Sequence, residues 1–444
     1  MLETALIILL VVLFAGVAWW KLDWAICITV IFLPAYLLRF AISFVPVTVL
    51  ELMVLILAAV WGYRTVSERI RTRACPAWLP WRWLLLLFVL AGSLAVFISP
   101  DIRQALGLWK AYIIEPVLFF VVFVNTITTR NHVRSVLWAL GAGTVLVGYG
   151  TLIQYAGLAP IPSPYGAEVP RRATSVFPFP TAVGKLLAPT VALFVGYWVA
   201  QAEASVKPLW QFVRRHLFTL GVVLFGLFGL LFSFSRGAVL GVAAAIVFAS
   251  FFSRWKRWIW VAAAVCLVVL LVVPFTRHQV ASVVGGSDTS ADVHRVMWRG
   301  AVRIIEAHPL LGTGLASFPV VYERYKEASH VEYFPNPDQL ILTLWIELGL
   351  FGLVVFVALL VKYFRVGLRT VREREADPFV RALTVGLMAA LVAIIIHGMV
   401  DTPYFKNDLA IQFWVLVGLL VVVSRLPVPV RSISEQPEKN RLGL

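Results

Sequence analysis

The sequence predicts an all-α integral membrane protein with 12 or 13 transmembrane helices and one large loop outside the membrane. Apolar and aromatic residues make up 61% of the 444 residues, charged residues only 14%, and the mean hydropathy is +0.89. A soluble domain is typically about 45–50% apolar and about 25% charged, so this composition excludes a water-soluble enzyme. Apolar surface on this scale has to be covered by a lipid bilayer.

Apolar runs that approach the roughly 20 residues needed to cross a bilayer recur along the whole chain. The first two are short and fit either a hairpin or one broken helix, so the count is 12 or 13. No basic segment precedes the first run, and we therefore expect a membrane anchor rather than a cleaved signal peptide. The runs lie near residues 5–20, 24–38, 42–62, 83–99, 105–126, 135–156, 180–201, 217–234, 238–252, 258–275, 339–361, 382–400 and 409–425.

The distribution of cations sets the orientation of these segments. Lys and Arg total 38 against 23 Asp and Glu, a net charge of +15. Basic connections of a membrane protein face the cytoplasm, which explains the excess without nucleic acid as a partner. Even numbers of crossings separate the four basic connections, so one topology places them all inside: 64–82, 207–215, 254–257 and 362–374. The opposite side then receives 100–104, 157–179, 235–237, 276–338 and 401–408, and the orientation of the N-terminus stays open.

This topology divides the chain into four regions. Transmembrane helices occupy 1–275 and 339–425, a large outer loop occupies 276–338, and a cytoplasmic tail follows in 426–444. Within the outer loop the sequence predicts one amphipathic helix, which Asp288, Ser290 or Asp292 can cap. We expect this helix to end near Ala307 and to lie on the outer membrane surface, over a cavity between the spanning helices. Its apolar face comprises Val293, Met297, Ala301 and Ile304.

One arginine stands in an unusual place for a membrane protein. Arg236 lies in a short turn on the outer side, between two apolar runs with almost no other polar residue. A charge at membrane depth is costly and usually marks a site. The arginine fits either an interfacial side chain that extends to water or a planar guanidinium that binds a phosphate group.

Two further segments bring arginine to the same side. Arg295, Arg299 and Arg303 are spaced by four and form one stripe of the loop helix, which taken alone fits a solvated polar face. Arg172 precedes a rigid proline-rich entry to a spanning run and taken alone fits an interfacial anchor. An anionic headgroup, most simply a diphosphate on a lipid, explains all three segments together.

Candidates for acid–base chemistry are few. The three cysteines show no metal or disulfide spacing, and the chain has neither a metalloprotease, a serine-hydrolase nor a P-loop motif. Asp338 stands out because it begins a spanning run, where a carboxylate fits either a helix cap or a general base at the water–lipid boundary. Glu115, inside a run, needs a partner, whereas His397 fits an ordinary buried histidine.

Four segments, taken in order, resemble the O-antigen ligase and polymerase superfamily of polytopic bacterial membrane glycosyltransferases. The Ser-Arg-Gly turn around Arg236 matches the family closely, and a Glu-x-Gly-x-x-Gly motif follows Asp338. Thr181 stands where the family usually has asparagine. The four segments are Arg172 to Pro189, Ser235-Arg236-Gly237, Arg295 to Gly314, and Asn336 to Gly352.

The main departure from the family lies at its presumed catalytic histidine. The family usually reads His-Pro-His-Asn where this chain reads Asn336-Pro337-Asp338-Gln339, so the histidine falls on Asp338 and the neighbouring asparagine on Gln339. Either Asp338 serves as the base itself, or the chain belongs to a branch with different substrates or weakened chemistry.

The resemblance implies a glycosyltransferase of the bacterial inner membrane, with its active site facing the periplasm. Such enzymes move a glycan from an undecaprenyl-diphosphate-linked donor to an acceptor hydroxyl, as a ligase or as a polymerase. The resemblance implies that Arg172, Arg236 and Arg295 hold the diphosphate and that Asp338 activates the acceptor, with no metal or other cofactor. Arg299 and Arg303 would assist on the diphosphate, and the supporting candidates are Asn336, Gln339, His294, His308 and Glu115.

Two other classes of function stay open. Arginines that line a cavity also suit a transporter of lipid-linked glycans or anions, although no internal repeat is visible in the sequence. A non-catalytic subunit of a polysaccharide export complex fits the missing histidine.

Overall fold

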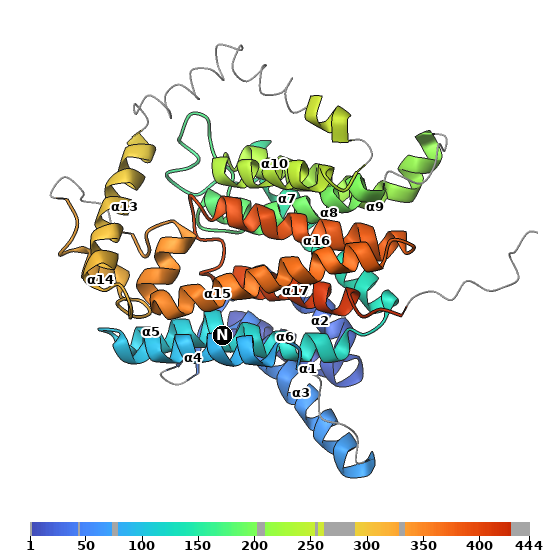
Figure 1. Cartoon of the computed structure of the whole chain (residues 1–444), viewed down its shortest axis with the longest axis horizontal. Coiled ribbons are helices and arrows are strands. Elements are labelled where there is room, and N and C mark those ends of the chain that lie inside the picture. The colour runs from blue at the N-terminus through green and yellow to red at the C-terminus, as the bar shows by residue number, and fades with distance from the viewer. Residues whose placement is uncertain are drawn as a thin grey trace, which may run out of the picture.

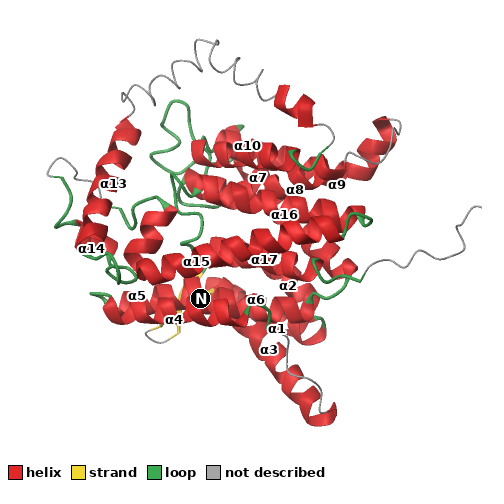
Figure 2. Cartoon of the chain, in the orientation of Figure 1, coloured by secondary structure: helices red, strands yellow, loops and turns green. Residues whose placement is uncertain are grey.

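The computed structural model describes residues 2–42, 45–72, 79–201, 209–253, 256–261, 289–327 and 334–427. Within these ranges the protein is almost entirely helical, which confirms the predicted all-α class (Figure 2). The strands found there form one antiparallel hairpin, β1 (Arg39–Ile42) with β2 (Val45–Thr48), in which Arg39 faces Thr48. The hairpin was not predicted, because its residues lie inside or beside the apolar runs at 24–38 and 42–62.

The helices follow the predicted apolar runs along the chain. The first half contains α1 (Leu2–Trp20), α2 (Leu22–Ile31), η1 (Leu33–Leu37), α3 (Val49–Thr72), α4 (Arg82–Ile98), α5 (Ile102–Trp109), η2 (Lys110–Ile114), α6 (Glu115–Thr126), α7 (Arg130–Tyr155) and α8 (Pro180–Gln201). The second half contains α9 (Leu209–Phe232), α10 (Arg236–Ser250), α13 (Thr289–Ala307), α14 (Phe318–Tyr322), α15 (Leu340–Glu373), α16 (Pro378–His397) and α17 (Asn407–Val423).

The described residues have the helices of a multi-pass membrane protein. Six helices there are long and apolar enough to cross a bilayer, and six further apolar helices have 10–17 residues. The predicted run at 258–275 lies largely outside the described residues, as do Asp288 and nearly all of the tail at 426–444. The membrane class is thus supported, and the number of crossings stays a prediction.

The helices run side by side in a bundle with two distinct ends, and α13 and α14 lie across one of them (Figure 1). At the other end, called here the Asp377 end, Arg130 of α7 pairs with Asp377, the N-cap of α16. There Arg381 also donates to the Phe252 carbonyl at 3.2 Å. The end that carries α13 is called the Asp338 end, because α15 begins there.

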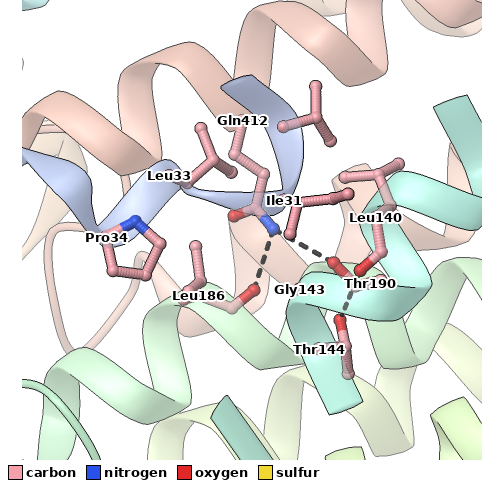
Figure 3. A pocket seen from close by; sticks show the side chains of 10 residues that line it. Ile31, Leu33, Pro34, Leu140, Gly143, Thr144, Leu186, Thr190 and Gln412 are labelled. Carbon is pink, nitrogen blue, oxygen red and sulfur yellow. Dashed lines mark hydrogen bonds between the residues drawn. The ribbon is translucent and has the colours of Figure 1, made fainter. Parts of the chain in front are cut away.

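Helices α8, α16 and α17 form the centre of the bundle. Gly196 of α8 and Gly386 of α16 let the two backbones approach closely, since a Cβ on Gly386 would lie 2.5 Å from the Leu193 carbonyl oxygen. Every residue of α17 from Asp408 to Val423 is buried. Gln412 links α17 to α8 by two hydrogen bonds: its side-chain amide donates to the Leu186 carbonyl at 2.8 Å and to Thr190 Oγ1 at 3.1 Å (Figure 3). The cavity beside Gln412 has a volume of only about 10 Å³, about the space that one water needs.

Helix α15 is interrupted within the Glu-Leu-Gly motif of the sequence. Gly349 has φ 71° and ψ 178°, a conformation that glycine adopts without a Cβ penalty. The turn at Gly312-Thr313-Gly314 is bonded to this break, because the Thr313 amide donates to the Ile346 carbonyl at 2.7 Å and the Leu350 amide to the Leu310 carbonyl at 3.0 Å. The loop after α13 is therefore fixed to the spanning helix that follows Asp338.

Helix α13 is the amphipathic helix that the sequence predicts. It spans Thr289–Ala307, and Met297, Ala301 and Ile304 of its predicted apolar face are fully buried. They pack against Phe318, Tyr322 and Ile346, whereas Val293 is only partly buried. Its position on a membrane surface stays a prediction.

Candidate active site

The Asp338 carboxylate is not used to cap a helix. Gln339 is the N-cap of α15, and its side chain accepts the Leu342 amide at 2.6 Å. Asp338 precedes the cap with φ 44°, a left-handed conformation in which Asp, Asn and His are enriched among non-glycine residues. The capping interpretation of Asp338 is therefore wrong, and its side chain is available for chemistry. Gln339 has a capping role of its own.

The loop that holds Asp338 is built by three hydrogen bonds from different parts of the chain. Asn336 Oδ1 accepts the Asp338 amide at 3.0 Å and the Thr402 hydroxyl at 3.3 Å. The Trp298 indole of α13 donates to the Pro337 carbonyl at 2.9 Å. One side of this loop thus rests on α13 and the other on the connection between α16 and α17, which fixes the position of Asp338.

Beside Asp338 lies a buried charge cluster, defined here as Lys185, His397 and Asp401. Lys185 of α8 places its Nζ 2.7 Å from Asp401 Oδ1, and both residues are about nine-tenths buried. The Thr402 amide donates to the same oxygen at 2.7 Å. His397 Nε2 lies 3.7 Å from Asp401 Oδ2 at the end of α16.

The two carboxylates have opposite electrostatic surroundings. Burial raises the pKa of Asp338 to about 6, and the negative charge of Asp401 adds to the rise while Lys185 opposes it. Burial would also raise the pKa of Asp401, but attraction to Lys185 and the hydrogen bonds from Lys185 and the Thr402 amide outweigh it and hold that pKa low. Asp401 therefore favours its ionised form, and Asp338, with a pKa of about 6, accepts a proton more readily. A group that titrates in this range suits a general base.

The arginine turn of the sequence packs directly on this cluster. A Cβ on Gly237 would lie 2.7 Å from the His397 ring, and one on Gly184, the neighbour of Lys185, would lie 2.3 Å from Ser235 Oγ. Arg236 is exposed at the first position of α10. The absence of side chains at both glycines lets the turn approach α8 and α16.

Arg172 reaches the same turn from the connection between α7 and α8. Its Nε donates to the Ser233 carbonyl at 3.3 Å, and the next amide, of Ala173, donates to the Phe232 carbonyl at 2.8 Å. Glu168 lies 4.0 Å from its guanidinium. Two of the three predicted arginine segments are therefore adjacent.

The third segment, the arginine stripe of α13, lies on an exposed face. Arg299 makes two bonds with Glu327, at 2.9 and 3.2 Å, and Arg303 lies 3.7 Å from the same carboxylate. Arg295 Nη1 lies 2.7 Å from Asp292 Oδ1 within the helix. These contacts are those of a solvated polar face, while Trp298 brings the same helix to the loop of Asp338.

The other supporting candidates are spread over the molecule. His294 lies against the Trp298 ring at 5.9 Å, and His308 is exposed just after α13. Glu115 is buried at the start of α6, near the ion pair of Lys110 with Glu51, and no described residue gives its carboxylate a hydrogen bond. Glu115 therefore belongs to a different part of the bundle from the Asp338 loop.

The sequence analysis missed Lys185 and Asp401 as site residues and assigned His397 to the core. One signal was present for Lys185, a single cation within the apolar run at 180–201, where a charge needs a partner. Asp401 was one of several outer-side carboxylates with nothing to set it apart. The pairing joins residues 216 positions apart, a distance that no local motif spans.

A larger cavity lies at the Asp377 end and contains none of the predicted site residues. Its volume is about 400 Å³, and its walls come from α7, α8, α9 and α16, including Arg134, Trp138 and Phe218. The predicted cavity beneath α13 stays a prediction.

Comparison with known proteins finds one family-model match, which covers part of the chain. No curated protein sequence matches the chain. Residues 221–357 match the family model for O-antigen ligase. The matched segment contains Arg236, the α13 arginines and Asp338, whereas Lys185 and Asp401 lie outside it. This match supports the O-antigen ligase superfamily for the chain.

Proposed function

We propose that this protein transfers a glycan from an undecaprenyl-diphosphate-linked donor to an acceptor hydroxyl, with Asp338 as the general base. The observation that carries the proposal is the place of Asp338. Its carboxylate is free of capping, sits beside a buried Lys185–Asp401 pair and lies on the same packed surface as the Ser235-Arg236-Gly237 turn. The family match supports a role of the glycosyltransferase type.

In the proposed reaction the acceptor oxygen attacks the anomeric carbon of the donor sugar. Asp338 takes the hydroxyl proton as the new carbon–oxygen bond forms. The bond from the anomeric carbon to the phosphate oxygen breaks, and its electron pair leaves with the carrier diphosphate. Arg236 and Arg172, which is bonded to the Ser233 carbonyl of the arginine turn, would bind this leaving group and stabilise its growing negative charge, with Arg295 as the predicted third ligand.

The basic connections support an orientation for this reaction. The Asp377 end gathers the basic start of α7, the basic end of α15 and Arg381 of α16, so positive residues favour a cytoplasmic position for it. The Asp338 end then faces the periplasm of a bacterial inner membrane. This position gives the site access both to lipid-linked donors in the bilayer and to acceptors in water.

Reconstitution of the purified protein tests the proposal. Protein in liposomes receives an undecaprenyl-diphosphate-linked oligosaccharide and a glycolipid acceptor, and the products are followed by mass spectrometry. We expect a new glycosidic bond together with released undecaprenyl diphosphate. Movement of intact donor between leaflets without bond formation would favour the transporter, and binding without either result would favour a non-catalytic subunit.

A further inference from the structure

Lys185 is a cation in the interior of the bundle, outside the segment that the family model matches. It belongs to the second turn of α8, its side chain is only 10% exposed, and its Nζ lies 2.7 Å from Asp401 Oδ1. A buried ammonium is costly unless it is paired and hydrogen-bonded. The ion pair with Asp401 therefore stabilises the buried ammonium of Lys185. A hydrophobic residue of similar volume would fill the same space and would need no such partner.

The charges around Lys185 leave it as the cation that two carboxylates share. Lys406 has its own carboxylate, Asp408 at 3.2 Å, and its ammonium lies over the rings of Tyr36 and Phe177 at 4.7 and 4.4 Å. Asp338 has Asp401 and Lys185 as its charged neighbours. The charged and titratable groups of the surrounding elements are Lys185 on α8, Arg236 on α10, His397 on α16, Asp401 and Lys406 in the connection to α17, and Asp408 on α17.

We propose that Lys185 is a positioning residue that holds Asp401 by a direct ion pair and, through its charge, keeps Asp338 ready to accept a proton. The ion pair anchors the connection between α16 and α17, and this connection supports Asp338 through the bond from Thr402 to Asn336. The proposal rests on the proposed function only where Asp338 is called the base. The measurement of an electrostatic link between Lys185 and Asp338 does not depend on glycan transfer.

Infrared titration measures this link without any substrate. The carbonyl stretch of a protonated carboxyl group is followed against pH in the full-length protein in detergent, and the band missing in Asp338→Asn is assigned to Asp338. In Lys185→Met we expect the titration midpoint of this band to rise by about 1 pH unit or more, because an opposite charge nearby favours the ionised form. Lys185→Arg should keep the wild-type midpoint, and so should Lys362→Met, a lysine in the second half of α15.

The transfer reaction gives the second readout. Lys185→Met should move the acidic limb of the pH–kcat/KM profile upward by the same interval, so its activity relative to wild type should be about fivefold lower, or more, at pH 6 than at pH 8.5. A merely structural lysine would lower activity equally at all pH values. Should Lys185→Met fold poorly, Lys185→Met with Asp401→Asn removes both charges, and we expect its Asp338 midpoint to return toward that of wild type.

The outcomes separate the two proposals. A shifted midpoint with no transfer by the wild-type protein would support the role of Lys185 and contradict the proposed function. Transfer by the wild-type protein with an unshifted midpoint in Lys185→Met would overturn the role of Lys185 alone.

Discussion

The buried charge cluster and the arginine stripe of α13 show two ways in which charges are held at one end of this bundle. Lys185, His397 and Asp401 are buried, and the contact of Lys185 with Asp401 joins residues 216 positions apart. Arg299 and Arg303 are about half exposed and pair with Glu327 on the surface. The sequence draws attention to the stripe, whereas the structure places the cluster beside Asp338.

The difference is one of solvation. An exposed ion pair is screened by water and contributes about 0–1 kcal/mol, so the α13 pairs leave their guanidinium groups free to exchange partners. A buried pair is held strongly, because removing one partner leaves an uncompensated charge. We therefore expect the cluster to organise the site, and Arg299 and Arg303 of the stripe to contribute to it only weakly.

Replacing the base should have the largest effect on activity. Asp338→Asn keeps the size of the side chain and removes its basicity, and we expect kcat/KM to fall by about 10²–10⁴-fold in the reconstituted transfer assay. Asp338→His should retain part of the activity, because histidine is the family's residue and tolerates the same backbone conformation. The matched control is Glu373→Gln, an exposed carboxylate at the Asp377 end. Normal turnover in Asp338→Asn would place the base elsewhere, with His294 the next candidate.

Removing the arginine turn should have the second largest effect. Arg236→Ala deletes a cation from the proposed diphosphate site, and we expect a loss of about 10²–10³-fold, mostly in kcat, because the charge on the leaving group grows in the transition state. Arg172→Ala should behave in the same direction. Arg369→Ala, an exposed arginine paired with Glu373, is the control. Wild-type kinetics in Arg236→Ala would remove this turn from the site.

Stability should separate the two kinds of charge directly. Asp401→Ala leaves Lys185 buried without its partner, and we expect the free energy of unfolding in detergent to fall by about 3–5 kcal/mol. Asp292→Ala removes an exposed partner of Arg295 and should change it by less than about 1 kcal/mol. Denaturant titration followed by circular dichroism measures both. Equal effects would show that the cluster is as weakly held as the surface pair.

The α13 stripe should give the smallest effect. Because Glu327 holds Arg299 and Arg303 on the surface, we expect Arg299→Ala and Arg303→Ala each to lower kcat/KM by less than about tenfold. The same steady-state assay, with Arg324→Ala as the control, decides this. A loss as large as that of Arg236→Ala would show that the stripe turns toward the donor during the reaction.

Much of the fold could be predicted from the sequence, because each span shows its own apolar run and α13 its own periodicity. The β1–β2 hairpin and the break at Gly349 were not predicted, since both depend on packing against distant segments. For the site, Asp338 and Arg236 stood out by their unusual local settings. Lys185 and Asp401 could not be recognised as a pair from the sequence, because they come together only when α8 packs against the end of α16 in the folded chain. The N-cap of α15 is Gln339, one residue after Asp338, which the sequence offered as a cap.

The pH dependence of glycan transfer by the wild-type protein tests the central claim most directly. A base must be ionised to act, and the pKa of Asp338 is raised to about 6. We therefore predict that kcat/KM is constant above about pH 7 and falls about tenfold per unit below pH 6, while the protein stays folded. A profile that stays level down to pH 4.5 in folded protein would contradict Asp338 as the base.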